Sequence, residues 1–257
     1  MDQPPELFEA DFVDYAKVCK PFTLTSLERL YALYKAVRFV VSSGIPGDLV
    51  ECGVWKGGSV MMMALTMKGL GITHRTIHLF DTFDGMTPPT ALDVDLRGVS
   101  AKDLLDRSDK KDGVYWAYSP IEEVRTNLAR TGYPMERFVF VPGDVRQTLP
   151  GSAPAHIALL RLDTDWYEST RHELEHLFPR LRARGVMIID DYGHFMGARK
   201  AVPAIREIPN APDRLYRPYS DQGLRAGAVR TGPGRWSCRP VASAPIRDIA
   251  DRALDCQ

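Results

Sequence analysis

The stretch Leu159-Leu-Arg-Leu-Asp-Thr-Asp-Trp-Tyr167 decides the predicted fold, because it begins as an apolar strand and ends in two carboxylates, Asp163 and Asp165. Residues two apart on a strand point to the same face, so both carboxylates are expected on one side of the strand's carboxyl end. A second apolar stretch, Gly185-Val-Met-Ile-Ile-Asp-Asp-Tyr192, also ends in two acids. Neighbouring strands that end in aspartates can surround a hard divalent cation with oxygen ligands.

These strand ends give a candidate metal site made of Asp163, Asp190 and Asp191. Each aspartate alone is explained equally well as the N-cap of a following helix. Together they are like charges, which need a cation or a proton when they pack closely. The structural alternative is an ion pair with Arg161, which shares a strand face with Asp163. His194 lies just beyond the acids and is a candidate base, although a lone histidine there is more often structural.

The segment that follows the strand at residues 48–54 is a glycine loop, Trp55-Lys-Gly-Gly-Ser59, and a helix over 60–68 comes next. Strand, glycine turn and helix open a Rossmann-like unit. Trp55 stands where the dinucleotide fingerprint requires its second glycine, and no Walker Lys-Ser/Thr pair follows, so pyrophosphate binding is disfavoured. The loop instead suits a cofactor with a cationic amino-acid end and a nucleoside, such as S-adenosylmethionine. A tight turn without any ligand is the alternative.

Two later strand ends extend this cofactor hypothesis. Asp81 ends the next strand, over residues 75–83, where folds of this kind bind ribose hydroxyls. Gly143-Asp144 ends the strand after that and is a candidate for a contact with the adenine amino group. Each aspartate is also explained as a turn or helix-capping residue.

The composition excludes several classes of protein. The 257 residues are 44% hydrophobic, and 33 basic residues balance 33 acidic ones, so there is no basic excess for nucleic-acid binding. The four cysteines include no C-x-x-C pair, which argues against a zinc site or a disulfide framework. The acidic N-terminus has no apolar signal region, and the longest apolar run is too short to span a bilayer. We therefore expect a cytoplasmic protein without membrane contact.

We expect one α/β domain over residues 1–257, with an N-terminal helical segment over 1–43 and a tail over 232–257. The proline-containing, charged run over 87–118 is long for a connection and is expected to form a lid-like insertion. Among the helices, one is expected from Thr25 or Ser26 to about Ser42.

Further elements are expected in the second half of the chain. A helix should run from Ser119 to about Thr131, another from Ser169 to Ala183, and a third over residues 197–206 despite Pro203. Segments 215–219 and 223–230 are expected to pair as an antiparallel hairpin.

Several stretches together resemble the macrocin O-methyltransferase family, over about residues 25–229. The matching stretches are Thr25-Ser-Leu-Glu-Arg-Leu-Tyr31, Val50-Glu-Cys-Gly-Val-Trp-Lys-Gly-Gly-Ser59, Phe80-Asp-Thr-Phe-Asp-Gly85, Leu162-Asp-Thr-Asp-Trp-Tyr-Glu-Ser-Thr170, and Ile189-Asp-Asp-Tyr-Gly193 with Gly197-Ala198. The insertion over 87–118 matches least well, and Gly143-Asp144 departs from the aromatic-containing loop of the antibiotic enzymes.

The resemblance implies a Rossmann-like class I methyltransferase fold, with a seven-stranded, mostly parallel sheet, an antiparallel last strand and helices on both faces. It also implies S-adenosylmethionine and Mg²⁺ as cofactors. It places Asp163, Asp190 and Asp191 at the metal and Asp165 as the catalytic base, with His194 as second candidate. The cofactor-binding residues that it implies are Thr25, Glu51, Gly53, Val54, Trp55, Gly57, Ser59, Asp81, Thr82, Ser119, Asp144 and Asp163.

The predicted function is Mg²⁺-dependent O-methylation of a hydroxyl on a sugar or a glycosylated small molecule. A phenol or catechol O-methyltransferase is the alternative within enzymes, and a non-catalytic S-adenosylmethionine-binding module is the alternative outside them. A dehydrogenase is disfavoured because the glycine loop does not suit a pyrophosphate. The expected partners are a small hydroxylated acceptor and further copies of the chain, as a homodimer or a higher homo-oligomer.

Overall fold

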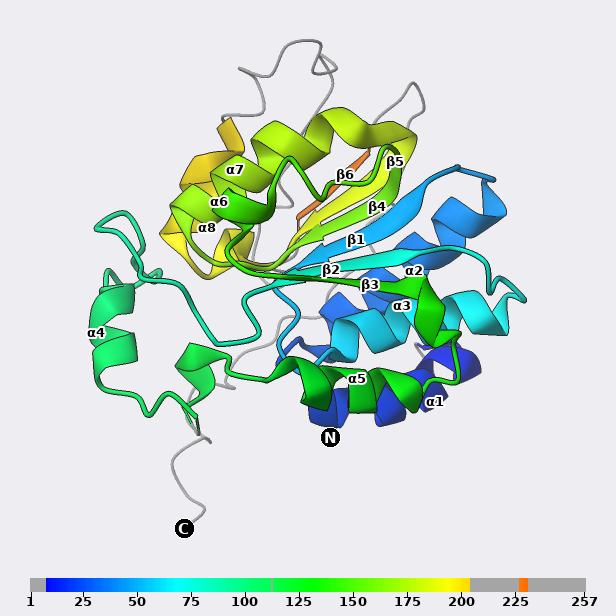
Figure 1. Cartoon of the computed structure of the whole chain (residues 1–257), viewed down its shortest axis with the longest axis horizontal. Helices are drawn as coiled ribbons and strands as arrows, with labels where there is room; N and C mark the ends of the chain where they lie inside the picture. The colour runs from blue at the N-terminus through cyan, green and yellow to red at the C-terminus, as the bar shows by residue number, and fades with distance from the viewer. Residues whose placement is uncertain (1–7, 112, 204–226, 231–257) are drawn as a thin grey trace, which may run out of the picture.

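The computed structural model describes residues 8–111, 113–203 and 227–230. Its centre is one sheet with the strand order β3-β2-β1-β4-β5-β6, in which β6 alone runs antiparallel to its neighbour (Figure 1). The strands are β1 (Asp48–Cys52), β2 (Ile77–Asp81), β3 (Phe138–Pro142), β4 (Ile157–Leu162), β5 (Leu181–Ile189) and β6 (Gly227–Arg230). All six residues of β4 are buried, as expected for a central parallel strand covered on both faces.

Helices cover both faces of the sheet (Figure 1). On one face lie α1 (Ala10–Cys19), α2 (Leu27–Ser42), α3 (Gly58–Gly69) and α5 (Ile121–Ala129). On the other lie α6 (Val145–Thr148), α7 (Tyr167–Leu177) and α8 (Met196–Ala201). Two separate apolar cores fill the layers, one around the three consecutive methionines of α3 and one around β4, β5 and α7. The predicted Rossmann-like fold with helices on both faces is therefore confirmed.

The strand register places the candidate site residues side by side. Cys52, the last residue of β1, pairs with Leu162 of β4, and Leu162 pairs with Ile189 of β5. The residues that follow these three strands therefore emerge together at one edge of the sheet. This is the edge at which open α/β sheets bind their ligands.

The predicted strand number differs from the structure. The described residues form six strands, not seven, and segment 215–219, expected to form one arm of a hairpin, lies outside them. The prediction that the last strand is antiparallel is confirmed by the pairing of β6 with β5. The helix predicted to reach Ala183 was wrong at its end, because α7 stops at Leu177 and a 3-10 turn over Phe178–Arg180 follows. Pro179 lies in that turn and cannot continue the helix.

The first long helix begins and ends as predicted. The Ser26 hydroxyl accepts a hydrogen bond from the Arg29 N–H and caps α2, which ends at Ser42. The N-terminal segment is helical too, with α1 followed by a 3-10 turn over Lys20–Phe22. Helix α8 ends two residues before Pro203, so it is shorter than predicted. No helix in the described ranges combines the length and apolar character needed to cross a bilayer.

The insertion over 87–118 is folded against the body of the protein. It contains α4 (Ala101–Asp106) and a 3-10 turn over Val114–Trp116. Asp93 is fully buried and accepts a hydrogen bond at 2.7 Å from the Tyr167 N–H at the start of α7. The Trp166 indole N–H donates to the Thr87 carbonyl at 2.9 Å. These contacts fix the insertion beside the carboxyl end of β4.

Candidate active site

A cavity of about 910 Å³ opens at the carboxyl edge of the sheet. Residues from the ends of five strands line it, as do residues from α2, the insertion and the N-terminal segment. The lining includes these predicted site residues: Thr25, Glu51, Gly53, Val54, Trp55, Ser59, Asp81, Thr82, Asp144, Asp163, Asp165, Asp190, Asp191 and His194. Gly57 and Ser119 are not part of the lining.

The glycine loop after β1 approaches β4 more closely than any side chain would allow. Gly53 has a φ of +81°, and a Cβ built on it would lie 2.1 Å from the Asp163 carbonyl oxygen. Only glycine fits such an approach in this conformation. Gly57, with a φ of +89°, instead precedes α3 and faces Val124, so its role is to shape the turn.

Asp81 holds the glycine loop in place. Its carboxylate accepts hydrogen bonds from the N–H groups of Val54 at 2.6 Å and Trp55 at 3.1 Å, and from Phe83 at 2.7 Å. Burial raises the pKa of Asp81, and the three backbone donors counteract part of this shift. Trp55 has a φ of +47°, which is rare for a residue other than glycine, so these bonds maintain a strained loop. The predicted ribose contact of Asp81 stays a prediction.

The remaining cofactor candidates differ in their surroundings. Asp144 caps α6 and forms an ion pair with Arg146 at 2.6 Å. Burial opposes ionisation of Asp144, but the hydrogen bonds from Arg146 outweigh it and hold the pKa of Asp144 below its ordinary value. Ser119 donates to Glu123 at the start of α5 and lies outside the cavity. The Thr82 hydroxyl donates to the Gly85 carbonyl at 2.6 Å within the turn after β2.

Arg161 lies fully buried beneath the cavity and bridges three carboxylates. Its guanidinium contacts Glu51 at 2.5 Å, Asp163 at 2.8 Å and Asp190 at 3.0 Å. It also donates to the Thr25 hydroxyl at 3.1 Å, so Thr25 serves the network as well as the cavity wall. Burial opposes the charge of Arg161, but the surrounding carboxylates raise its pKa well above the ordinary value. The ion pair considered as a structural alternative is therefore present.

Glu51 completes this network with one unused oxygen. It is almost fully buried, and its Oε2 atom has no hydrogen-bond partner among the described residues. Burial raises the pKa of Glu51 to about 8, and Arg161 counteracts part of the shift. Glu51 is among the cavity-lining residues, so a donor group on a bound molecule is a candidate partner for this oxygen.

Three carboxylates converge at the rim of this network. Oxygens of Asp163, Asp165 and Asp191 lie within 4.8 Å of one another. Asp191 shares hydrogen bonds with both of the others. Burial raises the pKa of Asp165 to about 7, and burial together with neighbouring negative charge raises the pKa values of Asp163 and Asp191. Such a group requires protons or a cation, and its oxygens suit a hard divalent ion.

Asp190, predicted as a metal ligand, lies in a different environment from Asp191. It is 4% exposed and has both oxygens in ion pairs, with Arg29 at 2.5 Å and Arg161 at 3.0 Å. The structure therefore brings Asp163 and Asp191 together as predicted, adds Asp165 to them, and holds Asp190 against two arginines. Asp165 has a φ of +63°, an unusual conformation for aspartate that is often found at functional sites.

His194 lies at the mouth of the cavity. Its ring packs edge-on against Phe195, with ring centroids 4.6 Å apart, and its side chain is exposed. It follows the 3-10 turn over Asp190–Gly193, so it lies next to the carboxylates in sequence. Its predicted role as a base stays a prediction.

Sequence reasoning missed the partners of the acids. Arg29 gave no sign of its role, because a charged residue in the first turns of an amphipathic helix is ordinarily exposed. Asp93 was also missed, because a carboxylate within a polar run has no sequence signature that marks it as buried. Arg161 was considered only as a partner of Asp163, and its contacts with Glu51 and Asp190 were missed, although a charged residue inside an otherwise apolar strand needs buried partners.

The parallel sheet with an antiparallel last strand, and the glycine turn after β1, define the class of Rossmann-like class I methyltransferases. The macrocin O-methyltransferase (TylF) family model matches residues 13–217 of this chain. The solved structure of the O-methyltransferase NovP is similar, with a TM-score of 0.66 and 30% identity, over 83% of each chain. The chain belongs to the macrocin O-methyltransferase family and is an O-methyltransferase.

Characterised relatives are similar over most of the chain. One, from Streptomyces olivaceus, is the 8-demethyl-8-(2,3-dimethoxy-alpha-L-rhamnosyl)-tetracenomycin-C 4'-O-methyltransferase, which is 39% identical over 191 residues. That match covers 74% of this chain and 68% of the relative. Another, the demethyldecarbamoylnovobiocin O-methyltransferase of Streptomyces niveus, is 32% identical over 197 residues, or 75% of this chain and 71% of the relative.

Proposed function

We propose that this enzyme transfers the methyl group of S-adenosylmethionine to a sugar hydroxyl of a glycosylated small molecule, in a reaction that requires Mg²⁺. The observation that supports this most directly is the convergence of three half-buried carboxylates beside a glycine loop in one cavity. The name of the relative from Streptomyces olivaceus describes 4'-O-methylation of a rhamnosyl derivative of tetracenomycin C.

The charge of the cavity favours a neutral glycoside over a phosphorylated sugar. Within the described part of the chain, Arg29 is the one Lys or Arg side chain in the lining, and it is paired with Asp190. Apart from the proposed Mg²⁺, a diphosphate would meet no unpaired cationic side chain among the described lining residues. Three large apolar side chains in the lining are substantially exposed: Leu24 by 52%, Val114 by 59% and Tyr115 by 49%. They suit an apolar aglycone that extends from the methylated sugar.

The cofactor is proposed to lie along the glycine loop. Gly53 lets the backbone approach closely, and the free oxygen of Glu51 can accept from the cationic amino group of S-adenosylmethionine. Asp81 and Asp144 lie further along the strand edge, where the ribose and the adenine of the cofactor would extend. Trp55, Ser59 and Thr82 complete the proposed contacts.

The carboxylates fit a magnesium ion by their donor chemistry. Asp163 and Asp191 are proposed as ligands, and Asp190 would join them through an oxygen that now contacts an arginine. When bound, a divalent cation lowers the pKa of an alcohol and orients it as a nucleophile. The protein's own contribution is to hold Asp163 in place, through its ion pair with Arg161.

Asp165 is the proposed general base. Its carboxylate lines the cavity beside Asp163 and Asp191, so it can reach the hydroxyl proton of an acceptor held there. With S-adenosylmethionine bound, Asp165 would take the hydroxyl proton, and the acceptor oxygen would receive the methyl group with S-adenosylhomocysteine as the leaving group. Holding the two reactants together supplies much of the acceleration. His194, at the cavity mouth, is the second candidate for the base.

A substrate screen tests the proposed function. Purified enzyme, S-adenosylmethionine and Mg²⁺ would be incubated in parallel with rhamnosylated or noviosylated aromatic compounds, nucleotide sugars and catechols. Mass spectrometry should show a gain of one methyl group on the sugar of a glycoside. Turnover of catechols alone would instead support the phenol or catechol alternative. Cofactor binding without any turnover would support the non-catalytic module.

The role of the metal needs a separate test. Turnover should be lost in excess EDTA and return when Mg²⁺ is added in excess over the chelator. Full activity in EDTA would exclude the proposed metal dependence while leaving the methyl-transfer reaction intact. The binding of S-adenosylhomocysteine, measured by calorimetry under both conditions, shows whether the chelator acts on catalysis or on the cofactor site.

A homo-oligomer is also proposed for this enzyme. The aromatic side chains of the N-terminal segment pack on α2 of their own chain, with Phe12 and Tyr31 ring centroids 4.9 Å apart. Phe8 lines the cavity, so the N-terminal segment forms part of the cavity wall. Light scattering coupled to gel filtration measures the assembly directly, and a monomer over the working concentration range would overturn this proposal.

A further inference from the structure

A second group of possible metal ligands lies on α7, outside the cavity. His172, Glu175 and His176 each offer one ligand atom, and these atoms all lie within 4.8 Å of one another. None of the three lines the active-site cavity. Both histidines are half-buried and Glu175 is exposed. This group therefore shares no residue with the carboxylates of the proposed reaction.

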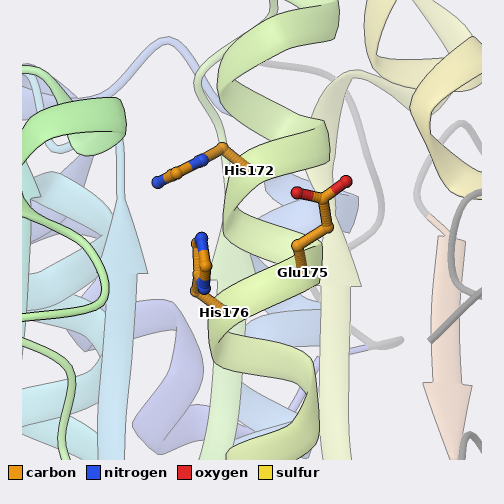
Figure 2. A group of neighbouring side chains, drawn as sticks. All are labelled: His172, Glu175 and His176. Atoms are coloured by element: carbon orange, nitrogen blue, oxygen red, sulfur yellow. The ribbon is translucent and has the colours of Figure 1, made fainter. Parts of the chain in front are cut away.

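The helix geometry places the two imidazoles together. Residues four apart on a helix lie one above the other on the same face. The ring centroids of His172 and His176 are 4.3 Å apart. In Figure 2 a nitrogen of His176 points toward the ring of His172, and the Glu175 carboxylate lies to one side of both rings. Two nitrogens and one oxygen around a shared space suit a borderline transition metal ion rather than Mg²⁺.

The outer nitrogen of His172 has a partner of its own. Its Nε2 atom lies 3.3 Å from the Leu149 carbonyl oxygen, at hydrogen-bond distance. When Nε2 carries the proton and donates to that carbonyl, the inner Nδ1 atom presents its lone pair to a metal. Histidine ligands of metals commonly use a backbone carbonyl in this way, which fixes the tautomer and the ring orientation.

The remaining ligands are also prepared for binding. His176 is half-buried on the same face of α7 as His172. Arg171 donates from Nε to one oxygen of Glu175, Oε1, at 2.8 Å. This ion pair holds the carboxylate on the same stretch of α7 as the two histidines.

We propose that His172, Glu175 and His176 bind one divalent transition metal ion of the zinc class. The ligand atoms are Nδ1 of His172, a carboxylate oxygen of Glu175 and Nε2 of His176, with solvent completing the coordination. The site is separate from the proposed Mg²⁺ site in both position and donor chemistry, so the two ions can be told apart.

The test is a calorimetric titration of untagged full-length enzyme with Zn²⁺, in buffer that contains Mg²⁺ in large excess to occupy the carboxylates. We expect one Zn²⁺ per chain. His172→Ala and His176→Ala should each weaken binding at least ~100-fold, beyond the effect of losing an outer hydrogen-bond partner. Glu175→Gln should weaken it roughly 10-fold. His74→Ala removes an exposed histidine elsewhere and should leave binding unchanged.

A spectroscopic measurement identifies the ligands independently. With Cu²⁺ in place of Zn²⁺, electron paramagnetic resonance should show coupling to imidazole nitrogens in the wild type and in His74→Ala, and lose it in the double variant His172→Ala/His176→Ala. Equal Zn²⁺ affinity in the wild type and the double variant would overturn the proposal. So would displacement of Zn²⁺ by Mg²⁺, or an absence of saturable binding.

Discussion

Asp190 and Asp191 are neighbours in sequence, yet the fold gives them opposite surroundings. Asp190 points toward Arg29 and Arg161 and has both oxygens in ion pairs. Asp191 instead joins Asp163 and Asp165, where burial and negative neighbours raise its pKa. One aspartate is neutralised within the protein, and the other belongs to a group that requires protons or a bound cation. Two adjacent aspartates thus differ in role: Asp190 is part of a network of ion pairs, and Asp191 is part of the candidate reaction site.

Removing Arg161, the cation shared by Asp190 and its neighbouring acids, should have the largest effect. Arg161→Met leaves the buried Glu51 and Asp190 and the half-buried Asp163 without their shared cation, so we expect the free energy of unfolding to fall by ~3–5 kcal/mol. Urea denaturation measures this change. Lys17→Met is the control, because Lys17 and Asp14 form an exposed pair, and it should change stability by less than ~1 kcal/mol. Equal effects of the two substitutions would show that the buried network contributes little.

Asp165→Asn tests the group of carboxylates formed by Asp163, Asp165 and Asp191. Turnover should fall at least ~100-fold, because the proposed base is lost. The Mg²⁺ concentration that gives half-maximal activity should change little. The comparison variants are Asp191→Asn and Asp190→Asn, both of which should raise the Mg²⁺ requirement if each is a ligand. Near-normal turnover in Asp165→Asn would move the role of base to His194, and a raised Mg²⁺ requirement in that variant would make Asp165 a ligand.

The dependence of stability on pH should further distinguish the carboxylate group around Asp165 from the ion pairs of Asp190. The pKa of Asp165 rises from 3.8 to about 7 in the folded chain, so the folded state binds more protons than the unfolded state in that window. Stability without metal should therefore fall as pH rises through it. Mg²⁺ replaces the protons, so the increase in Tm on adding Mg²⁺ should be larger at about pH 8 than at about pH 5.

Differential scanning fluorimetry with and without Mg²⁺ measures this dependence. In Asp165→Asn the difference between the two pH values should be smaller, because one titrating carboxylate is absent. A Tm increase that is the same at both pH values would argue that the carboxylates are ionised throughout.

Arg29→Gln is expected to have the smallest effect. It frees one oxygen of Asp190 and removes a positive charge near the carboxylates, so Mg²⁺ should bind roughly 3- to 10-fold more tightly. Titration calorimetry with Mg²⁺ measures the change. Arg38→Gln is the matched control, since Arg38 lies on the same helix but pairs with Glu9. Unchanged or weaker Mg²⁺ binding in Arg29→Gln would mean that Asp190 and its arginine serve the fold alone.

The sequence by itself determined which strands end in candidate site residues. Apolar runs that finish in acid or glycine define β1, β2, β4 and β5, because a buried parallel strand needs continuous apolar residues and releases polar ones at its end. The motifs also placed the glycine loop, Asp81 and the aspartate pairs around one cavity. The cap at Ser26 and the antiparallel last strand were likewise predictable.

Only the tertiary structure decided how the charges pair. No periodicity relates Arg29 to Asp190, which lie 161 positions apart, or shows that Arg161 serves three acids at once. The insertion is likewise held by contacts that local sequence does not reveal: Asp93 accepts from the Tyr167 N–H, 74 positions away, and Trp166 donates to the Thr87 carbonyl. Whether an aspartate is compensated or exposed to a ligand depends on which side chains reach it across the sheet, and that is a property of packing rather than of local sequence.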